Sequence, residues 1–174
     1  MKTARSPMRR LRLLRWGPEH FVDYPWRHKI PFWQALIAEV LLQRTRAQQV
    51  VPVFEEFLRR YPRVCEFAEA SEDDLRELFV TLGLHWRIPL IVAMARELGR
   101  RNGRLPRSVG GLRQLPGVGE YAASAAVSLH LGHHAILLDS NIVRLFARLT
   151  GRASDGETRR KRWTIDLVEL VTPA

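Results

Sequence analysis

Apolar residues recur along most of the chain at spacings of three and four, which is the pattern of one buried face of an α-helix. Glycine and proline residues divide this pattern into segments of about 10 to 15 residues. Runs of alternating β-branched residues are missing. The pattern predicts an all-α fold with helices over 8–16, 32–44, 47–60, 72–80, 87–101, 108–114, 120–131, 140–150 and 157–171.

Local start and stop signals support several of these helices. Ser71 and Asp74 have the spacing of a capping box at the start of helix 72–80, and Gly83 is placed to end that helix. Asp139 follows the apolar run AILL and directly precedes helix 140–150. The residue type and position of Asp139 are those of an ordinary N-cap.

The stretch LPGVGEYAASAA, residues 115–126, joins two predicted helices through a turn that contains Gly117 and Gly119. Glycine can adopt positive φ and leaves no Cβ in the way of an approaching molecule. The amides that open the following helix would then face outward and attract phosphate. A plain turn that only permits tight helix packing is the alternative, but two glycines followed by small residues favour phosphate binding.

The composition favours a polyanionic partner. The chain has 28 lysine and arginine residues against 18 acidic ones, a formal net charge of +10, and its only lysines are Lys2, Lys29 and Lys161. Arginine forks suit phosphates and base edges, so nucleic acid is the simplest such partner. A solvated basic surface is the alternative interpretation.

A single cysteine, Cys65, excludes an internal disulfide, a cysteine-ligated cluster and a cysteine-type zinc site. No apolar run approaches the length of a membrane span. The basic start of the chain lacks the apolar stretch of a signal peptide. We therefore expect no membrane association and a cytoplasmic or nucleoid-associated protein.

Three separated motifs carry a resemblance to a known family. Residues 115–151, LPGVGEYAASAAVSLHLGHHAILLDSNIVRLFARLTG, resemble the helix-hairpin-helix, Gly/Pro-rich loop and aspartate signature of the base-excision DNA glycosylases of the endonuclease III superfamily. YPWR (24–27) and AEVLLQRTRAQQV (38–50) are similar to the mismatch branch, which contains the adenine glycosylase MutY and the thymine/uracil mismatch glycosylases. The resemblance covers roughly residues 24–171.

The resemblance implies a two-lobed helix-hairpin-helix glycosylase fold. We expect a helical barrel domain over 28–150, with the hairpin at about 108–131, and a smaller lobe formed by 1–27 and 151–174. The family's four cysteines after the last helix are missing. Either this branch lacks the iron–sulfur loop, or the chain is a truncated or engineered piece of a longer protein. In both cases we expect a reduced second lobe and no [4Fe–4S] cluster.

The resemblance also implies catalytic roles for two carboxylates. Asp139 would stabilise the positive charge that develops on the sugar when the N-glycosidic bond breaks, which is compatible with an N-cap. Asn141 matches an asparagine near the sugar in the adenine branch, or is simply a polar residue at a helix start. Glu39 shares a helix face with Ala35 and Gln43 and matches an acid that contacts the leaving base. A solvent-facing stripe is the alternative for that face.

Further residues match DNA contacts of the family. Gln43 matches the glutamine that fills the space left by the flipped base, and Arg44 is then a candidate contact to the opposite strand. Leu84 matches an apolar wedge, with a core leucine as the alternative. Such fillers are needed because unstacking a base costs a few kcal/mol. The backbone carbonyls of Leu115 and Val118 are the implied site for Na⁺ or K⁺.

Tyr121 indicates the subclass. Strand-nicking members of the superfamily carry a lysine at this position, where its amine forms a Schiff base with the sugar. A tyrosine cannot do this, and the three lysines of the chain lie far from the motifs. Tyrosine here resembles the thymine/uracil branch, whereas the adenine branch typically has serine. An aromatic residue that packs on the core is the alternative role for Tyr121, and the lysine is missing in either case.

Together these features predict a monomeric, monofunctional glycosylase without lyase activity that removes thymine or uracil mispaired with guanine from double-stranded DNA. An adenine glycosylase acting on A·G or A·8-oxoguanine remains an alternative, favoured by Glu39, Gln43 and Asn141. The extra C-terminal domain of MutY is missing, which weakens this alternative. A non-catalytic helix-hairpin-helix DNA-binding module is the other.

Overall fold

A computed structural model of the 174-residue chain describes residues 7–171, and every regular element among them is a helix or a helical turn. The predicted all-α fold is confirmed for this part of the chain. Contacts divide the chain into two units. Pro25–Ala135 forms the larger unit, and the segments before and after it form the smaller one.

The position of residues 136–150 differs from the predicted domain boundary. The sequence assigns them to the middle domain, whereas the contact division groups them with the terminal segments. The cause is α9 (Ser140–Thr150), which packs on α10 (Arg162–Val171) and on the 3₁₀ turn η5 (Thr158–Arg160). The hairpin region, about 108–131, lies wholly in the larger unit.

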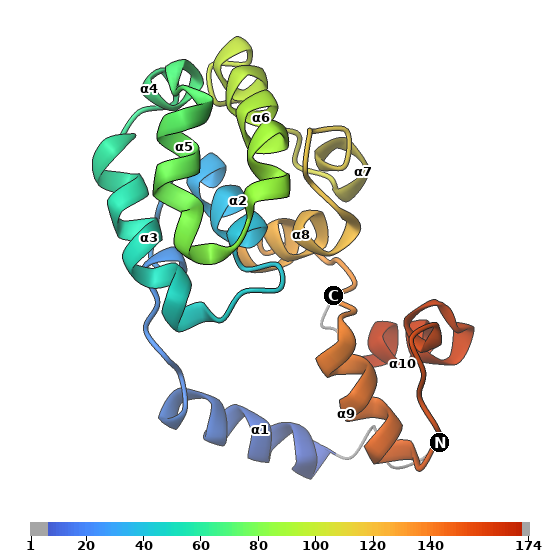
Figure 1. Ribbon diagram of the computed structural model, residues 1–174. Coiled ribbons are helices and arrows are strands. Elements are labelled where there is room, and N and C mark those ends of the chain that lie inside the picture. Colours follow the sequence, from blue (N-terminus) through green and yellow to red (C-terminus); the bar gives the residue numbers. More distant parts are fainter. Residues whose placement is uncertain (1–6, 172–174) are drawn as a thin grey trace. The chain divides into compact units, whose positions relative to one another are not determined.

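The larger unit is built around α2 (Phe32–Leu41), which contacts α3 and α8 (Figure 1). All residues of α2 from Trp33 to Leu41 are buried. A helix that is apolar on every side is stable only when other elements enclose it. The remaining elements are η1 (Pro25–Arg27), α3 (Ala47–Arg60), α4 (Val64–Glu69), α5 (Glu72–Phe79), η2 (Val80–Leu82), η3 (His85–Arg87), α6 (Ile88–Arg100), α7 (Val109–Leu112), α8 (Glu120–Ala125) and the π turn η4 (Ala126–His130).

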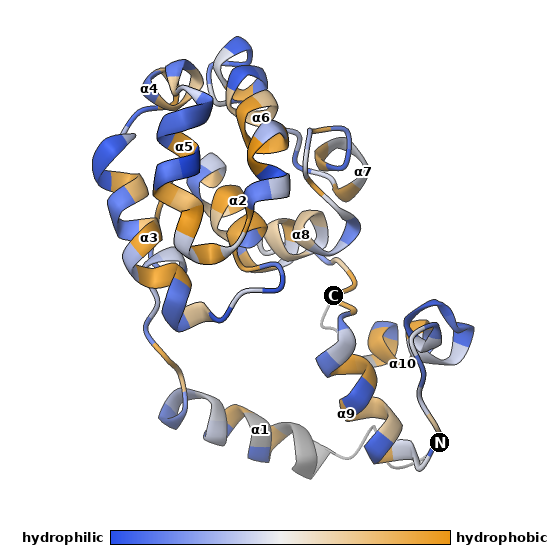
Figure 2. Cartoon of the chain, viewed as in Figure 1, coloured by the Kyte–Doolittle hydropathy of each residue, from blue (hydrophilic) through white to orange (hydrophobic). Residues whose placement is uncertain are grey.

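An aromatic cluster forms much of the core of the larger unit. The rings of Phe57 and Phe67 meet edge to face with centroids 5.1 Å apart, and Trp33 stacks on Phe67. Each fully buried side chain of this size stabilises the fold by about 1.5–3 kcal/mol. Figure 2 shows hydrophilic and hydrophobic residues interspersed along α3, α5 and α6, as expected for helices with one buried face.

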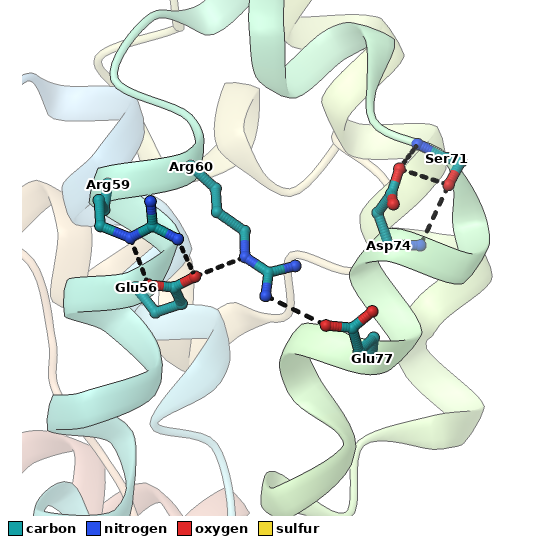
Figure 3. Close-up of polar contacts among 6 residues, drawn as sticks. All are labelled: Glu56, Arg59, Arg60, Ser71, Asp74 and Glu77. Atoms are coloured by element: carbon teal, nitrogen blue, oxygen red, sulfur yellow. Dashed lines mark hydrogen bonds and ion pairs between the residues drawn. The ribbon is translucent and has the colours of Figure 1, made fainter.

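Polar contacts fix the outer helices α3 and α5 (Figure 3). Glu56 accepts hydrogen bonds from Arg59 and Arg60, and Arg60 also reaches Glu77 on α5. The predicted capping box is confirmed: the Ser71 hydroxyl accepts from the Asp74 amide at 3.0 Å, and the Asp74 carboxylate accepts from the Ser71 amide at 3.2 Å.

Several details of the helices differ from the predictions. Helix α1 (Pro7–Glu19) continues through Gly17 and Pro18, because a proline so near the helix end removes a hydrogen bond only from the last turn. The short helix α4 was not predicted. The predicted helix 120–131 is confirmed in its bounds, but from Ala126 to His130 it has π rather than α geometry.

The smaller unit contains α1, α9, η5 and α10 among its described residues. Helix α9 ends at Gly151 in the left-handed conformation, and the guanidinium of Arg152 then lies over the Trp163 ring, 4.9 Å from its centroid. Thr158 and Thr164 are fully buried. Within residues 7–171, none of the helices is long and apolar enough to span a membrane.

Candidate active site

Glu39 is a buried carboxylate in the last turn of a mostly apolar helix. It lies on α2 with 4% of its surface exposed, and Ala35 one turn earlier is 1% exposed. The alternative of a solvent-facing stripe is therefore wrong for both residues. The Oε1 atom of Glu39 is hydrogen-bonded to Nε2 of His130 at 3.0 Å. Buried charges require such partners.

The π turn η4 brings His130 to Glu39. This turn packs directly against α2, and His130 is its last residue. A π turn holds an extra residue compared with an α-helical turn, so it changes the direction of the side chains that follow. π turns are rare and frequently lie at functional sites. His130 was not among the predicted site residues, because a helix of regular α geometry was expected at this position.

Arg87 ties two turns of the larger unit together. Its Nη1 atom donates to the backbone carbonyl of Val40 at 3.1 Å and to that of Gln43 at 3.4 Å. These carbonyls lie at and just after the C-terminal end of α2, where a cation is favoured. Burial, and secondarily the nearby charge of Arg44, lower the pKa of Arg87.

Gln43 and Arg44 follow the end of α2 at Leu41, three residues earlier than the predicted end of the helix at 44. Gln43 is half-buried, and Arg44 is exposed with a φ of 63°. A left-handed backbone is uncommon for arginine. The turn therefore has a defined conformation that presents the Arg44 side chain to solvent.

Leu84 and Trp86 have opposite surroundings in the turn that Arg87 anchors. Leu84 is 4% exposed, so it is a core residue. This is the alternative to the role of an apolar wedge in DNA. Trp86 is 62% exposed, and the Arg87 guanidinium lies 4.5 Å from the centroid of its ring. In the sequence, the only sign of this residue is a tryptophan in the short segment between Gly83 and Pro89.

The two hairpin glycines differ in conformation. Gly117 has a φ of +75°, and a Cβ at this position would lie 3.3 Å from Cβ of Leu90. Gly119 has a φ of −83° and no atom within 4 Å of such a Cβ. Gly117 is therefore needed for the turn itself, whereas Gly119 leaves open space beside the first amides of α8.

The hairpin backbone also contains a carbonyl oxygen that could coordinate a cation. The Leu115 carbonyl accepts a hydrogen bond from the Val118 amide at 3.2 Å, and both side chains are buried. A carbonyl oxygen has two lone pairs, so one remains on Leu115 after this bond. Oxygen ligands of this kind suit a hard cation.

Tyr121 is the second residue of α8 and is 39% exposed. Its ring is therefore not enclosed in the core, which was the alternative role considered for it. The predicted site residues on this unit are Glu39, Gln43, Arg44, Leu84, Gly117, Gly119 and Tyr121, while Asp139 and Asn141 belong to the smaller unit.

Both oxygens of the Asp139 carboxylate are hydrogen-bonded. Oδ1 accepts from the backbone amide of Ile142 at 2.8 Å, and Oδ2 accepts from the side-chain amide of Asn141 at 3.0 Å. The N-cap interpretation is therefore confirmed. The oxygen of the Asn141 amide accepts in turn from Arg144 at 2.6 Å. The carboxylate therefore lies at the start of an 11-residue helix, fixed by one backbone and one side-chain hydrogen bond.

A family model and several similar proteins point to the same family of DNA repair proteins. A family model described as "HhH-GPD superfamily base excision DNA repair protein" matches residues 37–165. The thymine-DNA glycosylase of Aeropyrum pernix is 44% identical over 131 residues, covering 74% of this chain and 59% of that protein. The thymine/uracil-DNA glycosylase of Pyrobaculum aerophilum is 39% identical over 146 residues, covering 81% and 64%. This chain thus spans less than two thirds of the length of these relatives.

Solved structures of a DNA glycosylase and of endonuclease III have a similar fold. The structure of a thermostable thymine-DNA glycosylase matches with a TM-score of 0.82 and 28% identity, over 92% of this chain and 75% of that one. A trapped endonuclease III–DNA covalent intermediate matches with a TM-score of 0.76 over 93% of this chain, and at 24% identity it supports the fold alone. A more distant sequence relative is the adenine DNA glycosylase of Mycobacterium tuberculosis, 32% identical over 162 residues, which cover 91% of this chain and 53% of that protein.

Proposed function

The chain belongs to the HhH-GPD superfamily of base excision DNA repair proteins, and from this membership we propose that it is a DNA glycosylase that removes thymine or uracil mispaired with guanine. The relatives named thymine-DNA and thymine/uracil-DNA glycosylase support this choice of base. The observation on which the chemistry rests is the Asp139 carboxylate, held through both oxygens at a helix N-terminus.

Asp139 acts on the sugar. The base leaves with the electron pair of the C1′–N bond, so positive charge develops on the sugar ring. A carboxylate that is already fixed stabilises this charge without rearranging during the reaction. Water then adds to C1′ and loses a proton, which leaves an abasic site.

Glu39 acts on the base. Its carboxyl group is buried and can hydrogen-bond the leaving base or protonate it, which makes the base a better leaving group. Tyr121, half-exposed at the start of α8, is proposed as a second contact to the base.

The reaction is proposed to stop at the abasic site. Tyr121 has no amine for a Schiff base, which is what a strand-nicking lyase requires. Of the lysines, Lys161 is held by Asp155 at 2.7 Å. No lysine stands at a position that the family resemblance assigns to catalysis.

Double-stranded DNA is the proposed partner, bound by a monomer. The hairpin amides around Gly119 contact backbone phosphate, and a monovalent cation held by the carbonyls of Leu115 and Val118 would add positive charge there. Gln43 fills the space that the extruded base leaves in the duplex, and Arg44 contacts the opposite strand. The exposed ring of Trp86, rather than the buried Leu84, presents apolar surface to the bases.

Adenine excision is a second candidate, because several relatives at about 30% identity are named adenine DNA glycosylase. The contact between Asn141 and Asp139 is a structural feature that fits this alternative, since it places an amide beside the carboxylate that acts on the sugar.

The test incubates the protein with duplexes containing G·T, G·U and A·8-oxoguanine, followed by hot alkali or by no alkali. We expect alkali-dependent breaks in the G·T and G·U duplexes. In Asp139→Asn the excision rate should fall at least about a hundredfold, because one group that stabilises the charge of the transition state is lost. Breaks without alkali contradict the monofunctional reaction, and excision of adenine alone contradicts the proposed base. A non-catalytic module would shift the DNA in a salt-sensitive manner without excising any base.

A further inference from the structure

We propose that His130 is a positioning residue that holds Glu39 in the orientation needed to contact the leaving base. This inference rests on the function proposed above and adds to it a residue to which the family resemblance assigned no role. The histidine and the glutamate lie 91 positions apart in the sequence, and their side-chain atoms are 3.0 Å apart.

The surroundings of this pair explain why its geometry is fixed. The two side chains are 12% and 5% exposed, so water does not compete strongly for the hydrogen bond. Glu39 lies in the rigid helix α2, and the turn that ends at His130 packs on the same helix. Polar contacts held between rigid elements are more precise than those on mobile loops.

The chemistry follows from the atoms involved. With Glu39 ionised, Nε2–H of His130 donates to Oε1. This is the only side-chain hydrogen bond of Glu39 among the described residues. One carboxylate oxygen is therefore committed to His130, and Oε2 remains for the base. Without this contact the carboxylate could rotate away from the base, and a misplacement of about 1 Å can cost about a hundredfold in rate.

A purely structural histidine would behave differently. If His130 only filled space, a leucine of similar size would replace it and a glutamine would offer no advantage. If His130 acts through Glu39, a side chain that can still donate to Oε1 should retain most of the activity. The effect of removing His130 should also vanish once Glu39 is itself changed, which a double-mutant cycle measures.

The experiment compares His130→Gln, His130→Leu, Glu39→Gln and the double variant Glu39→Gln/His130→Leu. Single-turnover excision from a G·U duplex, affinity for a duplex with a non-hydrolysable 2′-fluoro nucleotide, and the unfolding midpoint are measured for each. We expect His130→Leu to lose about ten- to a hundredfold in excision rate, with affinity within about twofold of the unaltered protein. His130→Gln should recover most of that loss, and His130→Leu should cause no further loss in the Glu39→Gln background.

A second readout does not depend on activity. The imidazole nitrogen signals of His130 in nuclear magnetic resonance spectra should move when Glu39 is replaced by glutamine, because the hydrogen-bond acceptor is then neutral. Unchanged signals would overturn the contact itself. Full activity of a folded His130→Leu variant, or an equal loss in both backgrounds, would overturn the positioning role alone. If the unaltered protein excises no base from any duplex, the proposed function fails together with the catalytic part of this inference.

Discussion

The guanidinium of Arg87 donates to the backbone carbonyl of Gln43 at 3.4 Å. Arg87, which directly follows the exposed Trp86, therefore holds the turn that contains Gln43 and Arg44. The same nitrogen also donates to the Val40 carbonyl. A single buried cation thus links the C-terminal end of α2 to the turn before α6. The side chains proposed to enter the duplex are therefore supported from inside the unit.

Replacing Arg87 should weaken both the fold and the reaction. Arg87→Met keeps the length of the side chain but removes the donors, which leaves two carbonyls without this partner. Hydrogen bonds from charged groups contribute about 1.5–3 kcal/mol, so we expect a loss of that order in unfolding free energy and a reduced excision rate. Denaturant unfolding checks the first and single-turnover assays the second.

Arg96→Met is the matched control for this prediction, because Arg96 is an exposed arginine on α6. Its unfolding free energy should change by less than about 0.5 kcal/mol. Equal stability of the Arg87 and Arg96 variants would show that Arg87 does not hold the turn.

Leu84 and Trp86 should separate into a folding role and a DNA-binding role. Leu84→Ala removes a buried side chain and should cost about 2–5 kcal/mol of unfolding free energy. Trp86→Ala should leave the fold nearly unchanged but weaken duplex binding, because stacking of one base on an aromatic ring contributes about 1–3 kcal/mol. Trp86→Phe retains an aromatic ring and should keep most of the affinity. If Leu84→Ala weakens binding without destabilising the fold, Leu84 is the wedge after all.

The helix boundaries that the sequence predicted correctly have local causes. The helices Ala47–Arg60 and Ser140–Thr150 match their predicted bounds. The first ends just before Pro62, and the second starts at an aspartate N-cap and ends at Gly151. Such signals act over three or four residues and can be recognised without tertiary structure.

The features that the sequence did not predict depend on distant contacts. The partners of Glu39 and Gln43 are His130 and Arg87, which lie 91 and 44 positions away in the sequence. The π turn and the early end of α2 lie where these contacts form. Family resemblance identified Glu39 as a candidate, but only the structure shows that it is buried and which side chain holds it.

Acid should remove the contribution of Glu56 to stability. Hydrogen bonds from Arg59 and Arg60 lower the pKa of Glu56 from 4.5 to about 2. A carboxyl group whose pKa is lowered by folding stabilises the fold above its unfolded pKa, and this contribution is lost as the pH falls through the folded value. The difference in stability between the unaltered protein and Glu56→Gln should therefore shrink from about pH 4.5 down to about pH 2.

Urea unfolding across that pH range measures the effect. The pair is on the surface, so high salt should reduce it. The double variant Arg59→Met/Arg60→Met is the control, because Glu56→Gln should add no pH dependence in that background. A difference that stays constant with pH would show that the arginines do not hold the Glu56 carboxylate.

The two hairpin glycines should respond differently to the same substitution. Gly117→Ala forces a side chain into a left-handed backbone and against Leu90, so it should cost about 1–2 kcal/mol of stability. Gly119→Ala places its methyl group in open space at an ordinary φ, so the unfolding free energy should change by less than about 0.5 kcal/mol.

Gly119→Ala should instead weaken the binding of DNA, because the new methyl group would stand where a phosphate approaches the amides of α8. The loss of one charge-assisted hydrogen bond, about 1.5 kcal/mol, corresponds to about a tenfold weaker affinity for duplex DNA, which a salt-controlled binding titration measures. Unchanged affinity of a folded Gly119→Ala variant would mean that DNA does not approach the backbone at this turn.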